Sequence, residues 1–337
     1  MNQLNRMLLA GRFHEVARAG EAALAAHPAD PDLHLLLGRA LVEVGRPGEA
    51  LSHLDFVVRL DTRRSWRWAW AQDYRARALY CLGRTADAHA ALDDAIASNA
   101  TRNVVRDARG LAHMIGYDAT FDGWREFRLG DVRVHYGTAV TRDQARAFAA
   151  SRAAALEQLR EWIPVKPLKP IDIFVWPDAG SARAAGFRSI GFARPELGLI
   201  HSRLDQTPAH ELVHVVVFQG LDSVHRTRFV NEGVAVLMDG TGRSRLAMAR
   251  LAVARLDGPV HIVDLWRDGQ RAPEPVVYPV AAAFLERLRE RGGEDRFKEF
   301  HRDQTVDRAR ELNGPLLDRV VESVERDLSA SARDPGG

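Results

Sequence analysis

The chain has 337 residues, 46% of them hydrophobic and 27% charged, a composition typical of globular proteins. At roughly 150 residues per domain, this length predicts about two domains. Basic and acidic residues nearly cancel, with a formal net charge of +2, which argues against nucleic-acid or membrane partners bound through bulk charge.

The single cysteine, Cys81, excludes an internal disulfide and a cysteine-rich zinc site. It lies in an apolar helical pattern, so we expect a buried, inert thiol. The first residues lack the apolar stretch of a signal peptide, and no segment reaches the ~20 apolar residues that cross a bilayer. The sequence therefore predicts a cytoplasmic protein without a membrane partner.

Three similar segments follow one another in the first third of the chain. They begin at Gly11, Gly45 and Gly83, at spacings of 34 and 38 residues. An apolar-periodic segment precedes each one, which predicts a unit of helix, glycine turn and second helix. The period and the pattern of small and large residues resemble tetratricopeptide repeats. The first unit lacks a full first helix, and a further helix over residues 103–115 is expected to cap the stack.

Such units bury their apolar faces only by stacking into a solenoid with a concave surface. The resemblance implies an all-α repeat domain over residues 1–116 whose groove binds a peptide or protein partner. A spacer or a dimerisation arm is the alternative. Trp66, Trp68 and Trp70 are expected to pack in the core or between domains rather than to bind a ligand.

From about residue 117 the pattern changes to mixed strands and helices. Alternation over residues 127–137 predicts a strand, residues 142–163 a long helix, and residues 171–177 a buried strand. Residues 191–204 read as a hairpin or edge strand. An edge strand over residues 197–203 could add a substrate peptide through main-chain hydrogen bonds, with His201 facing substrate or solvent.

Three or more helices follow the strands, and residues 329–337 are polar, which predicts a disordered tail. Strands first and helices later favour an α+β domain over residues 117–328. The sequence thus predicts an α+β protein with a helical-repeat domain ahead of a mixed domain.

The segment TPAHELVHVVVFQG contains an H-E-x-x-H motif, residues 210–214. This segment is predicted to form a helix, with Thr207 as its cap, Pro208 at its first position and Gly220 at its end. On that helix His210 and His214 lie one turn apart, so both imidazoles can bind one Zn²⁺. Glu211 then points to the side where a zinc-bound water would sit.

A second motif, RFVNEGVAVLMDG, places Glu232 eighteen positions after His214, on another apolar-periodic helix. Three protein ligands with an open water position are the usual form of a catalytic zinc site. The sequence therefore predicts a metal site made of His210, His214 and Glu232. The alternative is a pair of helical histidines beside an unrelated glutamate.

The two motifs together, HELVH and NEGVA, resemble the gluzincin metallopeptidases, and among them the peptidase MA-like domains. Residues 229–235 fit the segment (aromatic)-x-x-E-G-x-A of those domains. The resemblance covers residues 127–328 and implies a thermolysin-like zincin fold. It also implies that His210, His214 and Glu232 bind zinc and that Glu211 is the catalytic base.

The same resemblance implies a second donor, often a Tyr or His, for the charge that develops on the substrate carbonyl. Tyr278 is our candidate, with His225 and His261 as rivals and a packed core tyrosine as the alternative. At the position where thermolysin-like enzymes commonly have an Asp that orients a ligand His, this chain has Val236. Asp239 is the weaker candidate for that role.

The function expected from the resemblance is that of a zinc metallopeptidase whose repeat domain binds a substrate or partner. Zn²⁺ is the one cofactor that this implies. Phe229 stands where the family usually has Trp, a further departure from its pattern. Two alternatives stay open, a catalytically inactive zinc-binding scaffold for protein–protein interaction and a zinc hydrolase acting on a non-peptide amide.

Overall fold

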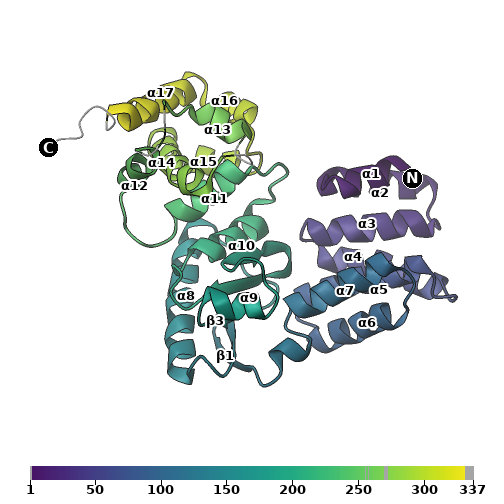
Figure 1. The fold of residues 1–337 in the computed structure, drawn as a ribbon. Coiled ribbons are helices and arrows are strands. Elements are labelled where there is room, and N and C mark those ends of the chain that lie inside the picture. The colour runs from purple at the N-terminus through teal and green to yellow at the C-terminus, as the bar shows by residue number, and fades with distance from the viewer. Residues whose placement is uncertain (1, 255, 257, 269–271, 331–337) are drawn as a thin grey trace. The chain divides into compact units, whose positions relative to one another are not determined.

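The computed structural model describes residues 2–254, 256, 258–268 and 272–330 (Figure 1). The chain forms two compact units. The first comprises Met1–Ala150 and Lys166–Leu204, and the second comprises Ser151–Val165 and Asp205–Gly337. The repeat helices and the strands thus share the first unit. The two units are defined by contacts within the folded chain, not by the change of sequence pattern at residue 117. The domain boundary predicted at that position stays a prediction.

Seven helices make up the N-terminal part of the first unit and stack in sequence order (Figure 1). They are α1 (Asn2–Leu9), α2 (Phe13–Ala26), α3 (Pro31–Glu43), α4 (Pro47–Leu60), α5 (Trp66–Cys81), α6 (Thr85–Ala97) and α7 (Arg102–Met114). α1 is shorter than α3 and α5, as expected for the first helix of the first repeat. The position of α7 confirms the helix expected over residues 103–115.

The backbone conformation of the turns explains why glycine recurs at the same place in each repeat. Gly11, Gly45 and Gly83 each occupy the turn between paired helices with φ of +72°, +80° and +75°. Side-chain-bearing residues rarely adopt this conformation, so the same residue recurs at each turn. Within the pair α3 and α4, a Cβ on Gly38 would lie 2.8 Å from Leu54, so glycine also permits the close approach of these helices.

The residues singled out in α5 are largely structural. Trp68 is buried and Trp70 half-buried, as expected, whereas Trp66 is exposed with the Arg67 guanidinium 4.6 Å above its ring. Cys81 is buried, as predicted, and its thiol donates to the carbonyl of Glu196 at 3.0 Å. Burial raises the pKa of Cys81 to about 12, so the thiol stays protonated.

A five-stranded mixed sheet completes the first unit, in the order β1-β2-β3-β5-β4. The strands are β1 (Arg125–Leu129), β2 (Val132–Tyr136), β3 (Ile171–Trp176), β4 (Phe192–Arg194) and β5 (Leu199–Arg203). The central pairings β2·β3 and β3·β5 are parallel, and the outer two are antiparallel. Short helical segments accompany the sheet: η1 (Ala119–Phe121), α9 (Ala179–Ala184) and η2 (Pro195–Leu197).

The alternation over residues 127–137 belongs to a hairpin of β1 and β2 rather than to one strand, because Gly130 turns the chain with φ of +57°. The hairpin predicted over residues 191–204 is confirmed as β4 and β5. The prediction of an edge strand over residues 197–203 is wrong. β5 is hydrogen-bonded on both sides, by β3 and by β4, so a peptide cannot add to it.

His201 on β5 is fully buried, so the expectation that it faces substrate or solvent is also wrong. Its ring stacks on Phe174 at 4.8 Å and on Phe192 at 5.2 Å. The Trp176 indole N–H donates to its Nδ1 at 3.2 Å, and its Nε2 lies 2.9 Å from the Met114 carbonyl oxygen. Burial lowers the pKa of His201 to about 3, and the neutral ring links α7 to the sheet.

Asp172 on β3 joins the repeats to the sheet. The Tyr80 hydroxyl of α5 donates to its carboxylate at 2.6 Å, and Lys169 Nζ does so at 2.6 Å. Arg133 and His135 on β2 lie at 2.5 and 2.8 Å. Burial opposes the charge on Asp172, but Lys169, His135 and Arg133 hold its pKa well below its ordinary value. The buried carboxylate is thus paired with side chains from both the repeats and the sheet.

The second unit is helical. α8 (Arg142–Trp162) contributes its C-terminal part, followed by α10 (His210–Leu221), α11 (Arg228–Leu237), α12 (Arg245–Val253), α13 (Ile262–Asp268), α14 (Glu274–Gly292), α15 (Glu294–Phe300), α16 (Val306–Asn313) and α17 (Pro315–Ala330). α14 is central and contacts α11, α12, α13, α15 and α17. The helices predicted after the strands are therefore present.

Repeat helices, a small mixed sheet and a helix-rich remainder make an α+β fold, as the sequence predicts. The tail expected over residues 329–337 begins inside α17, which continues to Ala330, and its other residues lie outside the described part of the chain. None of the described helices is long and apolar enough to cross a membrane.

Candidate metal centre

The H-E-x-x-H motif lies at the start of α10, but the helix begins later than predicted. His210 is its first residue and Ala209 precedes it without a side-chain cap, so Thr207 does not act as the cap. The helix ends at Leu221, and Asp222 takes the left-handed conformation that follows it. Gly220 has another role, because a Cβ there would lie 2.3 Å from Ile163 of the same unit.

α11 provides the second motif. Thr227 caps this helix by accepting a hydrogen bond from the backbone N–H of Val230, which places Glu232 in its second turn. Gly233 faces α14 so closely that a Cβ would lie 2.7 Å from Ala281. The glycine that follows the glutamate therefore allows α11 to pack on α14. Phe229 is buried against Trp266 and Phe284, so the aromatic residue of the motif belongs to the core.

The side chains of His210, His214 and Glu232 converge from the two helices. Nε2 of His210 lies 3.4 Å from Oε2 of Glu232, and Nε2 of His214 lies 3.7 Å from the same oxygen. One donor atom from each residue fits within 4.8 Å of the others. Zinc–ligand bonds of 2.0–2.2 Å at tetrahedral angles would separate two ligand atoms by roughly 3.3–3.5 Å. The His210–Glu232 separation matches this spacing, the His214–Glu232 separation is slightly longer, and two imidazoles with a carboxylate are a donor set that zinc accepts.

The protonation states of His214 and Glu232 suit a cation, whereas the raised pKa of His210 favours a proton on its ring until an ion displaces it. Burial lowers the pKa of His214 to about 4, so its ring is neutral and can offer a lone pair. Burial opposes the charge on Glu232, but His210 and His214 hold its pKa below the ordinary value, and the carboxylate is ionised. Burial lowers the pKa of His210, but Glu232 and Glu211 raise it by more, so that the pKa lies above its usual value.

Glu211 is buried beside the three donors and is not one of them. Burial raises the pKa of its carboxyl to about 7, with the charge of Glu232 acting in the same direction and that of His210 against it. A carboxyl group with a pKa near neutral can both accept and release a proton under ordinary conditions. Its carboxyl group is therefore suited to proton transfer near neutral pH.

Tyr278, the predicted second donor, lies on α14 next to this cluster. Hydrogen bonding by Tyr278 contributes to the lowered pKa of Glu232. Burial, followed by the charge of Glu232, raises the pKa of Tyr278 to about 12, so its hydroxyl remains a donor. The side chain is half-buried rather than packed in the core.

Arg228, which the sequence analysis did not single out, holds Tyr278. Its guanidinium lies 5.4 Å from the centre of the Tyr278 ring, pairs with Glu274 at 3.0 Å and donates to the carbonyl of Ala272 at 3.2 Å. Arg228 precedes Glu232 by one helical turn, and this i,i+4 spacing could have indicated that both side chains share a face of α11.

The other candidates lie elsewhere. His225 is exposed and pairs with Asp303 at 3.3 Å, and His261 is exposed ahead of α13. Within the described part of the chain, the cluster of side chains that could hold a metal includes neither. Asp239 accepts hydrogen bonds from Thr241 and pairs with Arg245 at 2.9 Å, and its charge contributes to the raised pKa of His210.

Comparison with known proteins identifies the N-terminal region. Residues 7–67 match the tetratricopeptide repeat family, which confirms the repeat expected there. The match covers α2, α3 and α4 with parts of their neighbours. A tetratricopeptide repeat indicates interaction with other proteins. Among curated proteins, the comparison of sequences finds no match.

Proposed function

We propose that the chain is a zinc-dependent metallopeptidase whose repeat helices bind a protein substrate or partner. The observation that carries the proposal is the convergence of His210, His214 and Glu232 from α10 and α11, with the donor spacing given above. Their residue types and order are those of the gluzincin peptidases, so we extend the proposal to a zincin-type catalytic domain.

The three donors would hold the ion, and a bound zinc would lower the pKa of a coordinated water towards neutrality and polarise a carbonyl. Glu211 has the complementary task of holding a proton. Its buried carboxylate accepts one from the attacking water and returns it to the departing amine. This use of Glu211 accounts for a buried acid that takes no part in holding the metal.

Tyr278 supplies a neutral hydroxyl beside Glu232. A fixed O–H donor can stabilise the negative charge that develops on a carbonyl oxygen, and such a donor is typically worth 10²–10³ in rate. Arg228 keeps the ring in place through its stacking and its pairing with Glu274. The same hydroxyl also orients the carboxylate of Glu232.

The decisive comparison uses zinc-loaded wild type and Glu211→Gln with a proteome-derived peptide mixture. The amide keeps the size of the side chain but cannot take up the proton. We expect both proteins to hold about one zinc per chain and only the wild type to cleave peptides. Equal cleavage by both would overturn the role of Glu211.

Two other outcomes identify the alternatives. Zinc at one per chain without cleavage by either protein would favour a zinc-binding interaction scaffold, for which the tetratricopeptide repeat is the supporting observation. Hydrolysis of small amides by the wild type, with all peptides intact, would favour a hydrolase of non-peptide amides.

A further inference from the structure

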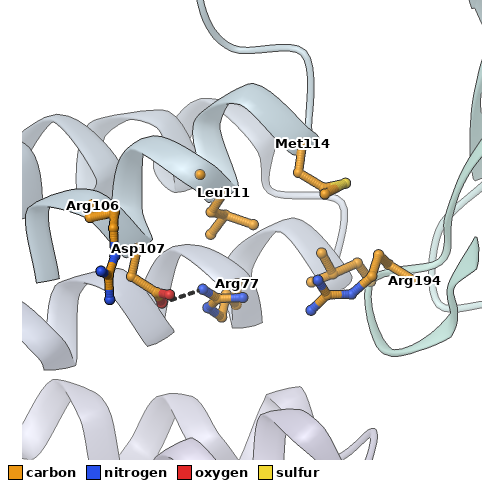
Figure 2. A pocket seen from close by; sticks show the side chains of 8 residues that line it. Arg77, Arg106, Asp107, Leu111, Met114 and Arg194 are labelled. Carbon is orange, nitrogen blue, oxygen red and sulfur yellow. Dashed lines mark hydrogen bonds and ion pairs between the residues drawn. The ribbon is translucent and has the colours of Figure 1, made fainter. Parts of the chain in front are cut away.

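The first unit contains an open pocket of about 220 Å³ between α5, α7 and the segment that joins β4 to η2 (Figure 2). Arg77 comes from α5, Arg106 and Asp107 from α7, and Arg194 from the end of β4. α5 and α7 contact each other within the helical stack, so the stack provides two of the three sides of the pocket.

The side chains that line the pocket carry three guanidinium groups and one carboxylate. Arg77 is buried, donates to Asp107 at 2.6 Å and pairs with Asp73 at 3.4 Å. Arg194 pairs with Glu196 at 2.6 Å. Arg106 is exposed and has no ion pair within the described part of the chain. The lining therefore has an excess of positive charge, with fixed guanidinium groups on two sides.

Three acids outside the lining, Asp73, Glu43 and Glu196, offset part of this charge, and Asp73 and Glu196 do so by pairing with Arg77 and Arg194. Burial raises the pKa of Asp73 to about 7, against the effect of Arg77, and burial also raises the pKa of Glu43. Both carboxyl groups are thus easier to protonate than ordinary acids. The guanidinium groups that face the pocket retain N–H donors for an incoming anion, since each arginine carries five.

The remaining wall is apolar. Leu111 and Met114 of α7 line it, as Figure 2 shows. At Gly110 a Cβ would meet nothing within 4 Å, so the space beside this helix is open rather than packed. A site of this size is smaller than the 300–1,000 Å³ of typical small-molecule pockets and has room for one or two side chains.

We propose that this pocket binds an acidic segment of a protein partner. A carboxylate of the segment pairs with Arg77, Arg106 and Arg194, and a neighbouring apolar side chain packs on Leu111 and Met114. Guanidinium groups bind carboxylates through paired hydrogen bonds, which gives both strength and geometry. Because Arg194 lies outside the repeats, the site is completed by the β4–η2 segment.

This inference rests on the part of the proposed function that assigns partner binding to the repeats, and it does not depend on zinc. Gly110 provides the sharpest test. Gly110→Phe puts a bulky side chain into the open space, and phenylalanine is a better helix former than glycine, so α7 should remain intact. A melting temperature equal to or above that of the wild type would verify the fold.

The experiment selects a displayed library of random heptapeptides on the full-length wild type and removes those that also bind Gly110→Phe. We expect the remaining peptides to be enriched in Glu or Asp next to apolar residues. The best of them, labelled with fluorescein, should bind Arg106→Gln and Arg194→Gln at least tenfold more weakly and lose affinity as salt is raised. Mass spectrometry verifies that the peptide is intact, which separates binding from cleavage.

Two results would overturn the proposal. Either no peptide distinguishes the wild type from Gly110→Phe, or the peptides that do so lack acidic residues. Neither result bears on zinc or on Glu211, so failure of the pocket and failure of the peptidase function are distinguishable.

Discussion

Nε2 of His210 lies 3.4 Å from Oε2 of Glu232, although the two residues belong to different helices, α10 and α11. The separation exceeds an ordinary hydrogen bond of 2.7–3.2 Å and is close to the edge of a zinc tetrahedron, roughly 3.3–3.5 Å. The pair therefore sets the dimensions of the proposed metal centre, and His214 completes it from one turn further along α10.

The first prediction concerns metal removal. Zinc bound only by the folded chain should stabilise it by about 2.7 kcal/mol when free zinc is a hundredfold above Kd. Thermal unfolding with zinc and with a chelator should show this difference in wild type. Glu232→Ala should unfold alike in both, whereas Glu290→Ala, which removes an exposed acid on α14, should behave like wild type. A zinc response in Glu232→Ala would contradict its role as a ligand.

The second prediction concerns Tyr278. If its hydroxyl stabilises charge on the substrate, Tyr278→Phe should keep the zinc and lower kcat by about 10²–10³, with a smaller change in KM. Tyr117→Phe removes the same atom from a tyrosine that donates to Asp93 in the repeats and should leave turnover unchanged. Loss of zinc from Tyr278→Phe would instead indicate that the hydroxyl mainly orients Glu232.

The third prediction concerns the glycine that follows Glu232. Gly233→Ala would place a Cβ 2.7 Å from Ala281 and 2.8 Å from Leu285, so we expect a loss of about 1–3 kcal/mol in the free energy of unfolding. Gly110→Ala, in a helix with open space around it, should gain up to about 1 kcal/mol. Urea unfolding of the two variants measures both, and equal stabilities would show that α11 and α14 are less closely packed.

The fourth prediction concerns acid stability. Because burial lowers the pKa of His201 to about 3, the unfolded chain binds a proton below pH 6.5 that the folded chain does not. Stability should therefore fall as pH decreases from 6.5 towards 3, by about 1.4 kcal/mol per pH unit from this residue. Between pH 6 and 5, His201→Phe should reduce the slope of the free energy of unfolding against pH by about 1.4 kcal/mol per pH unit, which corresponds to one proton.

The control for the fourth prediction is His27→Phe, which replaces an exposed histidine in the repeats. Its slope is measured under the same conditions, so that the effect of losing any histidine can be separated from that of losing the buried ring. An unchanged slope in His201→Phe would show that the buried ring is already protonated in the folded chain.

Short sequence patterns were enough to predict the repeats and the two neighbouring histidines of α10. The turns at Gly11, Gly45 and Gly83 follow from a backbone conformation that few other residues adopt, so the repeats could be read from spacing alone. The proximity of His210 and His214 likewise follows from the period of one helix. The approach of Glu232 depended on a resemblance, because nothing local in the sequence dictates how α11 packs beside α10.

Features that depend on contacts between distant segments could not be read in this way. The sequence places His201 on a strand, but its burial comes from Phe174, Phe192 and Trp176, which the sheet brings together. The pocket at Arg77 and Arg194 joins residues more than a hundred positions apart. Thr207 and Pro208 have the composition of a helix start, yet α10 begins only at His210.

One measurement tests the central claim most directly. Crystals of the zinc-loaded protein, with anomalous differences recorded at the zinc absorption edge, locate the ion without assumptions about activity. We predict a single strong peak at about 2.0–2.2 Å from Nε2 of His210, Nε2 of His214 and a carboxylate oxygen of Glu232. A zinc-loaded crystal whose peak lies elsewhere, or that has no peak beside these three side chains, would contradict the account.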